Sequence, residues 1–243
     1  MGRELTYPSE RLTAAAQLAA AVVFNGETGS GLSAIDVGCD HAKLAIYLVQ
    51  SGICKRVLAC DINDGPVNKA KENVSRRKFM NEPLDKYINV LKNDGLTGLE
   101  DVDADRVFIL GMGGELIANI LESAAYTRDV NRKTAYVLQA MTSEYDLRKY
   151  LYENGYKIVK EQLVRDKERI YSLILCCYDG IKRDKDEVSL ILGECNINNR
   201  TELFEEYLER KIRIQNSLVV QLETAGVDFE TQKELLDKLQ QLK

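Results

Sequence analysis

Residues 34–41 of the 243-residue chain, AIDVGCDH, combine a short apolar run, a glycine and two acidic residues. The apolar run at 34–37 predicts a buried strand, and residues 42–50 predict the helix that follows it. Gly38 lets the backbone pass close to a ligand at the end of the strand. In open parallel sheets, ligands bind beyond the carboxyl ends of the strands. The stretch therefore predicts an α/β fold with a ligand site at this turn.

The chain continues this alternation of strands and helices. Predicted strands cover residues 56–62, 88–91, 106–110 and 135–139, and predicted helices cover residues 67–78, 115–124 and 143–154. Residues 156–164 and 170–178 predict two further strands, and the turn between them is too short for a parallel crossover. Right-handed crossovers then favour a doubly wound topology. The result is a parallel sheet with a terminal antiparallel hairpin, which is typical of Rossmann-like class I methyltransferases.

Helical segments flank the predicted sheet on both sides of the sequence. Residues 8–24 predict an N-terminal helix that Ser9 can cap. After residue 199, apolar residues are spaced to line one helix face, namely Leu203, Tyr207, Ile214, Leu218 and Leu222. Gly226 interrupts this pattern, and residues 229–242 predict a second helix. We expect a methyltransferase domain over residues 1–180 and a helical hairpin of coiled-coil type over residues 181–243.

The composition is that of an ordinary soluble protein. Hydrophobic residues make up 45%, charged residues 29%, and the net charge is -5. No apolar run reaches membrane-spanning length, and the N-terminus lacks the pattern of a signal peptide. We therefore expect a cytoplasmic protein without a membrane partner.

The cysteines predict buried, reduced thiols and no metal site. They are Cys39, Cys54, Cys60, Cys176, Cys177 and Cys195. None forms a C-x-x-C pair, and the chain has a single histidine, His41. A zinc site needs paired soft ligands at short spacing, which this sequence lacks.

Asp40 distinguishes between two classes of cofactor. Nicotinamide-binding sequences place a glycine-rich G-x-G-x-x-G loop after the first strand, whereas this chain has only Gly38 followed by Asp40. A carboxylate repels a pyrophosphate, but it attracts the sulfonium and ammonium groups of S-adenosylmethionine. The turn therefore favours S-adenosylmethionine over a dinucleotide.

Two further acidic residues follow the next predicted strands. Asp61 and Ile62 end the second strand, where an acid can accept both ribose hydroxyls of an adenosine. Asp61 can instead cap the following helix. Asp94 and Gly95 follow the third strand, and Asp94 can accept from an adenine amine or form an ordinary Asp-Gly turn.

The loop after the fourth strand is GMGG, residues 111–114. Three glycines make this loop compact, either for a substrate or for a close approach of the next helix. The Asn-Pro-Pro-Tyr type of sequence found in exocyclic amine methyltransferases is absent. The loop therefore favours a ring nitrogen, an oxygen or a carbon as the methyl acceptor. No cysteine lies in a recognisable nucleophile setting, which disfavours a covalent mechanism.

Taken in order, these segments resemble the TrmK family of bacterial tRNA (adenine-22-N1)-methyltransferases. The segments are DVGCDHAKL at 36–44, DINDGP at 61–66, NDGL at 93–96, GMGG at 111–114, LQAM at 138–141, LRKYL at 147–151 and EQLV at 161–164. The resemblance covers about residues 11–178, and the C-terminal helical hairpin is also family-like. Cys39 and Ala140 depart from the family pattern, which often has threonine and proline at these positions.

The resemblance implies methyl transfer from S-adenosylmethionine to N1 of an adenine in the D-arm region of tRNA. It also implies that one set of residues lines the cofactor pocket: Asp36, Gly38, Asp40, His41, Asp61, Ile62, Asp94, Gly95 and Gly111. Adenine N1 carries an in-plane lone pair, so attack needs no prior deprotonation. The candidate catalytic residues are Asp40, which can stabilise the cationic product or hold the cofactor, and His41, which can contact cofactor or base.

A tRNA substrate requires an aromatic platform for the extruded base and cations for the phosphates. The candidate platforms are Tyr7, Tyr47 and Tyr145. The candidate cations are Arg76, Arg77, Lys78, Arg128, Arg132, Lys133, Arg148, Lys149, Arg210, Lys211 and Arg213. Each of these cations can equally belong to a solvated helix face.

Other functions remain open at this point. A class I methyltransferase acting on a small molecule or a protein needs no basic surface beside the pocket. A non-catalytic S-adenosylmethionine-binding sensor can use the C-terminal helices for self-association. A nicotinamide-dependent oxidoreductase is disfavoured by Asp40 and by the single glycine.

Overall fold

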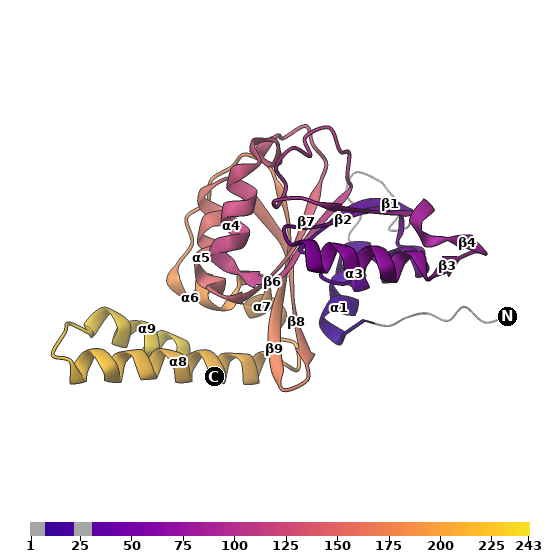
Figure 1. Ribbon diagram of the computed structural model, residues 1–243. Coiled ribbons are helices and arrows are strands. Elements are labelled where there is room, and N and C mark those ends of the chain that lie inside the picture. The colour runs from indigo at the N-terminus through magenta and orange to yellow at the C-terminus, as the bar shows by residue number, and fades with distance from the viewer. Residues whose placement is uncertain (1–7, 22–30) are drawn as a thin grey trace.

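The computed structural model describes residues 8–21 and 31–243, and within them a seven-stranded sheet has the order β5-β2-β1-β6-β7-β9-β8 (Figure 1). Neighbouring strands are parallel from β5 to β7, and β9 and β8 are antiparallel. The strands are β1 (Leu32–Val37), β2 (Cys54–Asp61), β5 (Ile88–Lys92), β6 (Arg106–Gly113), β7 (Ala135–Thr142), β8 (Tyr156–Asp166) and β9 (Arg169–Tyr178). The predicted Rossmann-like sheet with a terminal antiparallel hairpin is confirmed.

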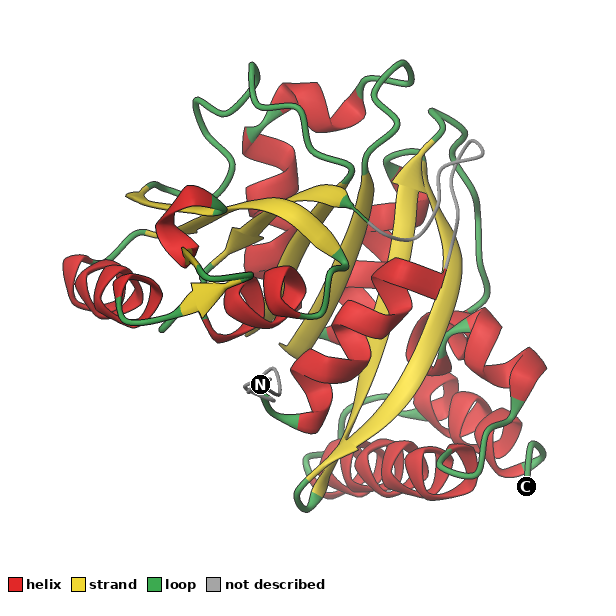
Figure 2. Ribbon diagram, turned by 90° about the vertical axis from the view of Figure 1, so that its right-hand side faces the viewer, coloured by secondary structure: helices red, strands yellow, loops and turns green. Residues whose placement is uncertain are grey.

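Helices cover both faces of the sheet (Figures 1 and 2). The helices α1 (Glu10–Ala21), α2 (Lys43–Gln50) and α3 (Asp64–Ser75) lie on one face, and α4 (Gly114–Ser123) and α5 (Glu144–Glu153) lie on the other. Successive strand residues point to opposite faces, so Phe108 packs with the first group and Ile109 with the second. The sheet thus separates two apolar cores.

Several short elements were not predicted. They are β3 (Lys78–Phe79), β4 (Glu82–Pro83), η1 (Leu84–Lys86), η2 (Ala125–Arg128), α6 (Glu187–Leu192) and α7 (Glu194–Asn199). The helices among them are shorter than two turns, and each of the two strands has only two residues. Elements this short leave no periodic pattern in the sequence. The predicted N-terminal helix is present as α1, with the Ser9 hydroxyl 3.5 Å from the Leu12 amide nitrogen. Its predicted end at 22–24 lies outside the described residues.

The C-terminal hairpin consists of α8 (Phe204–Thr224) and α9 (Glu230–Gln240), which extend from the body as an arm (Figure 1). The predicted apolar stripe is right at Tyr207, which is fully buried, but wrong at Ile214 and Leu218, which are 59% and 38% exposed. Gln215 faces α9 instead, and its side-chain amide donates to the Gln232 carbonyl at 3.0 Å. A hydrogen-bonded polar residue, Gln215, therefore takes part in the interface between α8 and α9. The spacing of apolar residues alone does not reveal this.

A buried arginine ties the edge of the sheet to its helices. The Arg148 guanidinium donates to Glu161 at 2.7 Å and to Ser172 at 3.0 Å. It also donates to the backbone carbonyls of Leu190 and Ile191 at 3.0 and 3.1 Å. Arg148 has no exposed surface, so its prediction as an RNA-contacting residue is wrong. It instead joins α5, β8, β9 and α6.

A second buried cluster attaches the arm to the body. The Tyr207 hydroxyl donates to Glu144 at 2.6 Å, and the Lys211 ammonium group lies 2.7 Å from the same carboxylate oxygen. Burial alone would raise the pKa of Glu144, but the Lys211 charge holds that pKa below its usual value. The Arg210 guanidinium lies 3.8 Å from Glu144. Lys211 and Arg210 thus hold α8 against the first turn of α5, while Arg213 is exposed.

We predict that Arg148→Met lowers the free energy of unfolding by about 3–5 kcal/mol, because it leaves the Glu161 carboxylate buried without its cation. The matched control is Arg165→Met, which removes an exposed ion pair with Glu206 and is expected to cost less than about 1 kcal/mol. Urea denaturation of the full chain measures both. Equal losses of unfolding free energy in the two variants would contradict the structural role of the buried Arg148–Glu161 pair.

Candidate functional site

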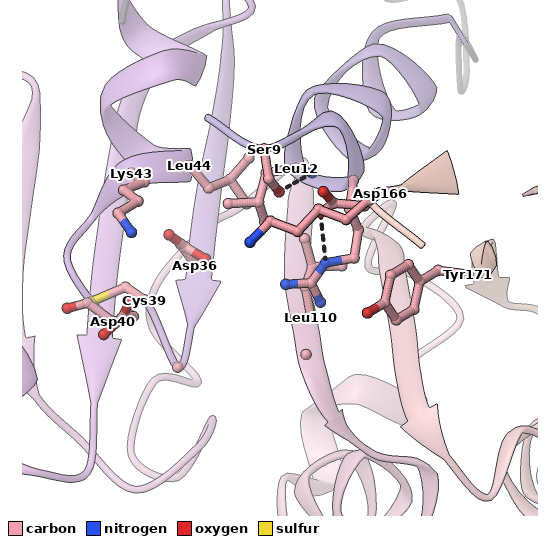
Figure 3. Close-up of a pocket in the computed structure, with 14 residues that line it drawn as sticks. Ser9, Leu12, Asp36, Cys39, Asp40, Lys43, Leu44, Leu110, Asp166 and Tyr171 are labelled. Carbon is pink, nitrogen blue, oxygen red and sulfur yellow. Dashed lines mark hydrogen bonds and ion pairs between the residues drawn. The ribbon is translucent and has the colours of Figure 1, made fainter. Parts of the chain in front are cut away.

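A cavity of about 450 Å³ lies at the carboxyl ends of β1 and β6 and beside the β8–β9 hairpin. Figure 3 shows Asp36, Asp40 and Lys43 on one side of it and Asp166 and Tyr171 on the other. The lining residues are Ser9, Arg11, Leu12, Asp36, Gly38, Cys39, Asp40, Lys43, Leu44, Leu110, Gly111, Asp166, Lys167 and Tyr171. Four of the nine predicted cofactor-binding residues, at positions 36, 38, 40 and 111, therefore meet in one cavity.

Asp36 carries an unsatisfied oxygen on this cavity. Its side chain is buried in β1, and among the described residues its Oδ2 atom has no hydrogen-bond partner. Burial raises the pKa of Asp36 to about 7; the backbone amide of Ala45 opposes this shift, and the nearby charge of Asp61 adds to it. A buried carboxyl group with an unused acceptor fits a ligand that brings a cation or a hydrogen-bond donor.

The turn after β1 brings the backbone close to the cavity. Gly38 has a φ of +70°, a backbone conformation that L side chains rarely adopt, and a Cβ atom there would also displace the Met112 methyl group, so glycine is favoured. The Gly38 and Cys39 amides donate to the Cys60 carbonyl at 2.8 and 2.9 Å, which fixes the turn against β2. Asp40 follows at a φ of +48° and presents an exposed carboxylate. The turn thus sets a buried acid and an exposed acid four residues apart at one end of β1.

His41 lies in an adjoining pocket of about 340 Å³ rather than in the main cavity. Its Nε2 atom is 3.4 Å from the Asp40 carboxylate. The pocket is lined by Pro8, His41, Lys43, Ile46, Lys69, Asn73 and Arg77. Lys43 borders both spaces. His41 therefore lies beside the main cavity, with Asp40 and Lys43 between the two spaces.

Asp61 and Asp94 follow the two neighbouring strands, on the other side of the β1 turn from β6. Asp61 is half-buried, and its Oδ1 accepts from the Asn63 amide at 3.0 Å. Ile62 is 54% exposed. Asp94 is exposed, and Gly95 after it packs its backbone against Ile120. These four residues do not line the main cavity but occupy the adjacent ends of β2 and β5.

The end of β6 is held by a residue from α1, and β6 runs to Gly113, so the loop predicted at residues 111–114 is the last part of this strand and the first residue of α4. Gly111 has a φ of +78°, and a Cβ atom there would lie 3.1 Å from the Arg11 guanidinium. The Gly111 amide donates to the side-chain oxygen of Gln139 at 3.2 Å, and Arg11 donates to the same oxygen. Gln139 is completely buried at the end of β7. Gly111 therefore provides room for Arg11 beside the end of β6.

The sequence analysis missed several residues that line the cavity. Arg11 comes from α1, and Asp166 and Tyr171 come from the two strands of the hairpin. The Arg11 guanidinium carbon lies 5.3 Å from the centre of the Tyr171 ring, and Arg11 Nε lies 4.0 Å from the Asp166 carboxylate. The only sequence signal was the charged turn between the last two strands, which does not indicate where the hairpin tip lies.

The structure places the predicted aromatic platforms Tyr47 and Tyr145 away from the main cavity. Tyr47 is only 5% exposed and belongs to the core under α2, so it is wrong as a platform. Tyr145 packs with the core on the α4–α5 face and donates to Glu187 at 3.1 Å. Tyr7 lies outside the described residues. Within the described part of the chain, Tyr171 is the aromatic residue that lines the main cavity.

The cysteines and acids give no sign of metal or thiol chemistry in residues 8–21 and 31–243. No group of three or more potential ligands is placed to hold a metal ion there. Burial raises the pKa of Cys54 and of Cys60 to about 12, which keeps both thiols protonated at neutral pH.

Within residues 8–21 and 31–243, no helix is long and apolar enough to span a membrane.

Comparisons with known proteins point to one family. The sequence model of the TrmK family, tRNA (adenine(22)-N(1))-methyltransferase, matches residues 34–243. The tRNA (adenine(22)-N(1))-methyltransferase of Bacillus subtilis (strain 168) is 27% identical to this chain over 224 residues, which cover 88% of this chain and 90% of that protein.

Solved structures agree with this match. The structure of the B. subtilis m1A22 tRNA methyltransferase TrmK has a TM-score of 0.75 at 26% identity, and the match covers 97% of this chain and 95% of that chain. The structure of M. capricolum TrmK in complex with S-adenosyl-homocysteine has a TM-score of 0.76 at 26% identity, and covers 96% of both chains.

Asp36 predicts a specific pH dependence of stability. Its pKa is raised in the folded protein, so the unfolded chain releases this proton first and the fold loses stability as the pH rises from about 4 to about 7. Asp36→Asn removes this loss. The free energy of unfolding of the ligand-free variant, minus that of the original protein, should therefore be larger at pH 8 than at pH 4 by an amount on the order of 4 kcal/mol. Urea denaturation of both proteins at the two pH values measures this difference. A stability difference that does not change with pH contradicts it.

Proposed function

The chain belongs to the TrmK family of tRNA (adenine(22)-N(1))-methyltransferases, and we propose that it methylates N1 of adenine 22 in tRNA with S-adenosylmethionine as donor. The structural observation that carries this proposal is the buried Asp36 carboxyl group, whose Oδ2 atom is unpartnered within the described chain. S-adenosylmethionine brings an ammonium group and a sulfonium group, and a cation beside Asp36 relieves the cost of burying its charge. The donor set of the cavity therefore fits this cofactor.

We assign the predicted cofactor-binding residues to parts of the cofactor by their place along the strand ends. Asp36 binds the ammonium group, and Gly38 lets the backbone approach the methionine portion. Asp61, at the end of β2, accepts from the ribose hydroxyls. Asp94 accepts from the adenine amine. Three further residues, Ile62, Gly95 and Gly111, contribute shape rather than charge.

The proposed methyl transfer mainly requires the protein to align the methyl group of the cofactor with N1 of the adenine. The cofactor supplies an electrophilic methyl group when it is bound, and the N1 lone pair of adenine needs no base to become nucleophilic. The adenine ring gains a positive charge as the bond forms, so a carboxylate beside it lowers the barrier. We assign this role to Asp40, whose exposed carboxylate lines the cavity, and we place His41 as its neighbour at 3.4 Å.

Cations around the cavity are placed to bind RNA phosphates. Lys43 and Lys167 are exposed and line the cavity itself, and the exposed Lys69 and the half-buried Arg77 line the adjoining pocket. Arg213 is exposed on α8. A phosphate backbone that crosses from the adjoining pocket to the hairpin meets positive charge along the way, which supports a tRNA partner.

The arm is joined to the same side of the molecule by the β8–β9 hairpin. Arg165 of β8 donates to Glu206 of α8 at 3.1 Å, and the next residue, Asp166, lines the cavity. We propose that residues 1–180 form the methyltransferase domain and that the C-terminal segment, residues 181–243, carries the arm, which contacts the tRNA body. Self-association through this arm stays a prediction, supported by the exposed side chains of Ile214 and Val220.

We also place the protein in the cytoplasm, because its proposed substrate is found there. The described residues contain no membrane-spanning helix.

Methyl transfer from labelled S-adenosylmethionine to unmodified bacterial tRNA tests the proposed function. We expect nucleoside analysis to find 1-methyladenosine, and we expect its loss when adenine 22 is replaced by guanine. Cofactor binding without any labelled tRNA would overturn the substrate assignment and favour a small-molecule methyltransferase or a sensor. Labelled tRNA that lacks 1-methyladenosine would overturn the assigned atom.

Asp40→Asn separates catalysis from cofactor binding. Asparagine tolerates the positive φ of position 40, so the turn is retained. We expect kcat to fall about tenfold through the lost charge, while the Kd for S-adenosylmethionine changes by less than about twofold. His41→Asn is the matched control, with a smaller loss because His41 lies outside the main cavity. A large rise in Kd with unchanged kcat would assign Asp40 to cofactor binding instead.

A further inference from the structure

One wall of the main cavity is an aromatic ring from a strand that the cofactor-binding motifs do not include. Tyr171 lies in β9, is half-buried, and faces the cavity opposite Asp36 and Asp40 (Figure 3). Leu110 and Gly111, at the end of β6, lie in the same lining. The cavity thus has an acidic end at β1, which the cofactor assignment uses, and an aromatic end at β9, which it does not.

In this structure a planar cation covers the aromatic end. The Arg11 guanidinium carbon lies 5.3 Å from the centre of the Tyr171 ring. Arg11 also donates to Gln139 and lies 4.0 Å from Asp166. A guanidinium plane and a nucleic-acid base are the two planar groups that proteins commonly stack with aromatic rings. The face of the Tyr171 ring that Arg11 covers therefore borders the cavity and offers a surface on which a planar group can lie.

We propose that Tyr171 is the platform on which the target adenine stacks, and that the base takes the position that the Arg11 guanidinium occupies in this structure. This inference rests on the proposed function, because the base must be extruded for N1 to react. A tyrosine ring adds a flat apolar surface that does not depend on the sequence around the base. The adenine then lies in the cavity that also holds Asp36 and Asp40.

The charges of the reaction explain why Arg11 must leave the ring. The adenine becomes cationic when the methyl group is transferred, so a guanidinium in contact with it would oppose the reaction. Arg11 has another partner, Gln139, toward which it can remain directed. Asp166, which lies 4.0 Å from Arg11 Nε in this structure, then loses that contact and can face the cationic product. Replacement of Arg11 by the base thus removes a repulsion and exposes an attraction.

Kinetics of ring-removing variants test the proposal. Tyr171→Leu keeps apolar volume but removes the ring, and we expect kcat/KM for tRNA to fall roughly 5- to 150-fold, the range for loss of one base–aromatic stack. Tyr171→Phe keeps the ring and should stay within about twofold of the original protein. Tyr145→Leu is the matched control on the other face of the sheet and should have no effect. The Kd for S-adenosylmethionine should be unchanged in all three variants.

Two kinetic outcomes overturn the proposal. One is full activity in Tyr171→Leu, and the other is an equal loss in Tyr171→Phe, which would assign the role to the hydroxyl group. A loss in Tyr171→Leu that is accompanied by weaker cofactor binding or a lower melting temperature is attributed to structure, and the binding measurement below then decides.

Fluorescence of tRNA with 2-aminopurine at position 22 reads stacking without turnover. We expect a quenched signal in complexes with the original protein and with Tyr171→Phe, and a brighter signal with Tyr171→Leu. Equal brightness in all complexes overturns the stacking assignment. If the original protein forms no 1-methyladenosine, the proposed function fails by itself, and this measurement still reports whether Tyr171 holds the base.

Discussion

The structure depends on a carboxyl group that is buried at the end of the central strand with one oxygen left unpartnered among the described residues. Asp36 lies in β1, between β2 and β6, where it is buried but lines the main cavity. Burial of an unpaired charge costs stability, and the raised pKa of Asp36 expresses that cost. A cationic ligand offsets the unfavourable free energy of burying the Asp36 carboxylate, and this offset favours binding of the ligand. The tight glycine turn and the acids at the ends of β2 and β5 are arranged around this position.

A second set of buried charges serves structure instead. Arg148 and Glu161 are both fully buried but partner each other, and Glu144 is paired with Lys211. These pairs join the parallel sheet, the hairpin and the arm into one body. Glu144 begins α5 directly after β7, the strand that carries Gln139 beside the cavity. The site and the arm are therefore connected through a few short polar contacts. The contrast with Asp36 is physical: paired buried charges position elements, whereas the Asp36 carboxyl group keeps an oxygen without a partner among the described residues, which a ligand can use.

Sequence patterns predicted the sheet and its acidic end but not its aromatic end. Asp36 lies in the first strand and Gly38 and Asp40 follow that strand directly, so periodicity alone locates them at a strand end, where ligands of parallel sheets bind. Arg11 and Tyr171 are separated by 160 residues and meet only because α1 crosses the hairpin. Arg148 was indistinguishable from a surface cation until its partners were known. Ile214 was placed inward by its spacing, because periodicity does not reveal that Gln215 has a polar partner on α9.

The central claim is that Asp36 is protonated in the free protein and becomes a carboxylate when S-adenosylmethionine binds. Isothermal titration calorimetry at pH 6, in buffers of different ionisation enthalpy, counts the protons released on binding. We predict that the original protein releases about one proton and that Asp36→Asn releases almost none. Equal proton release by the two proteins, or none by the original protein, would contradict the claim that this buried carboxyl group is matched to the charge of the cofactor.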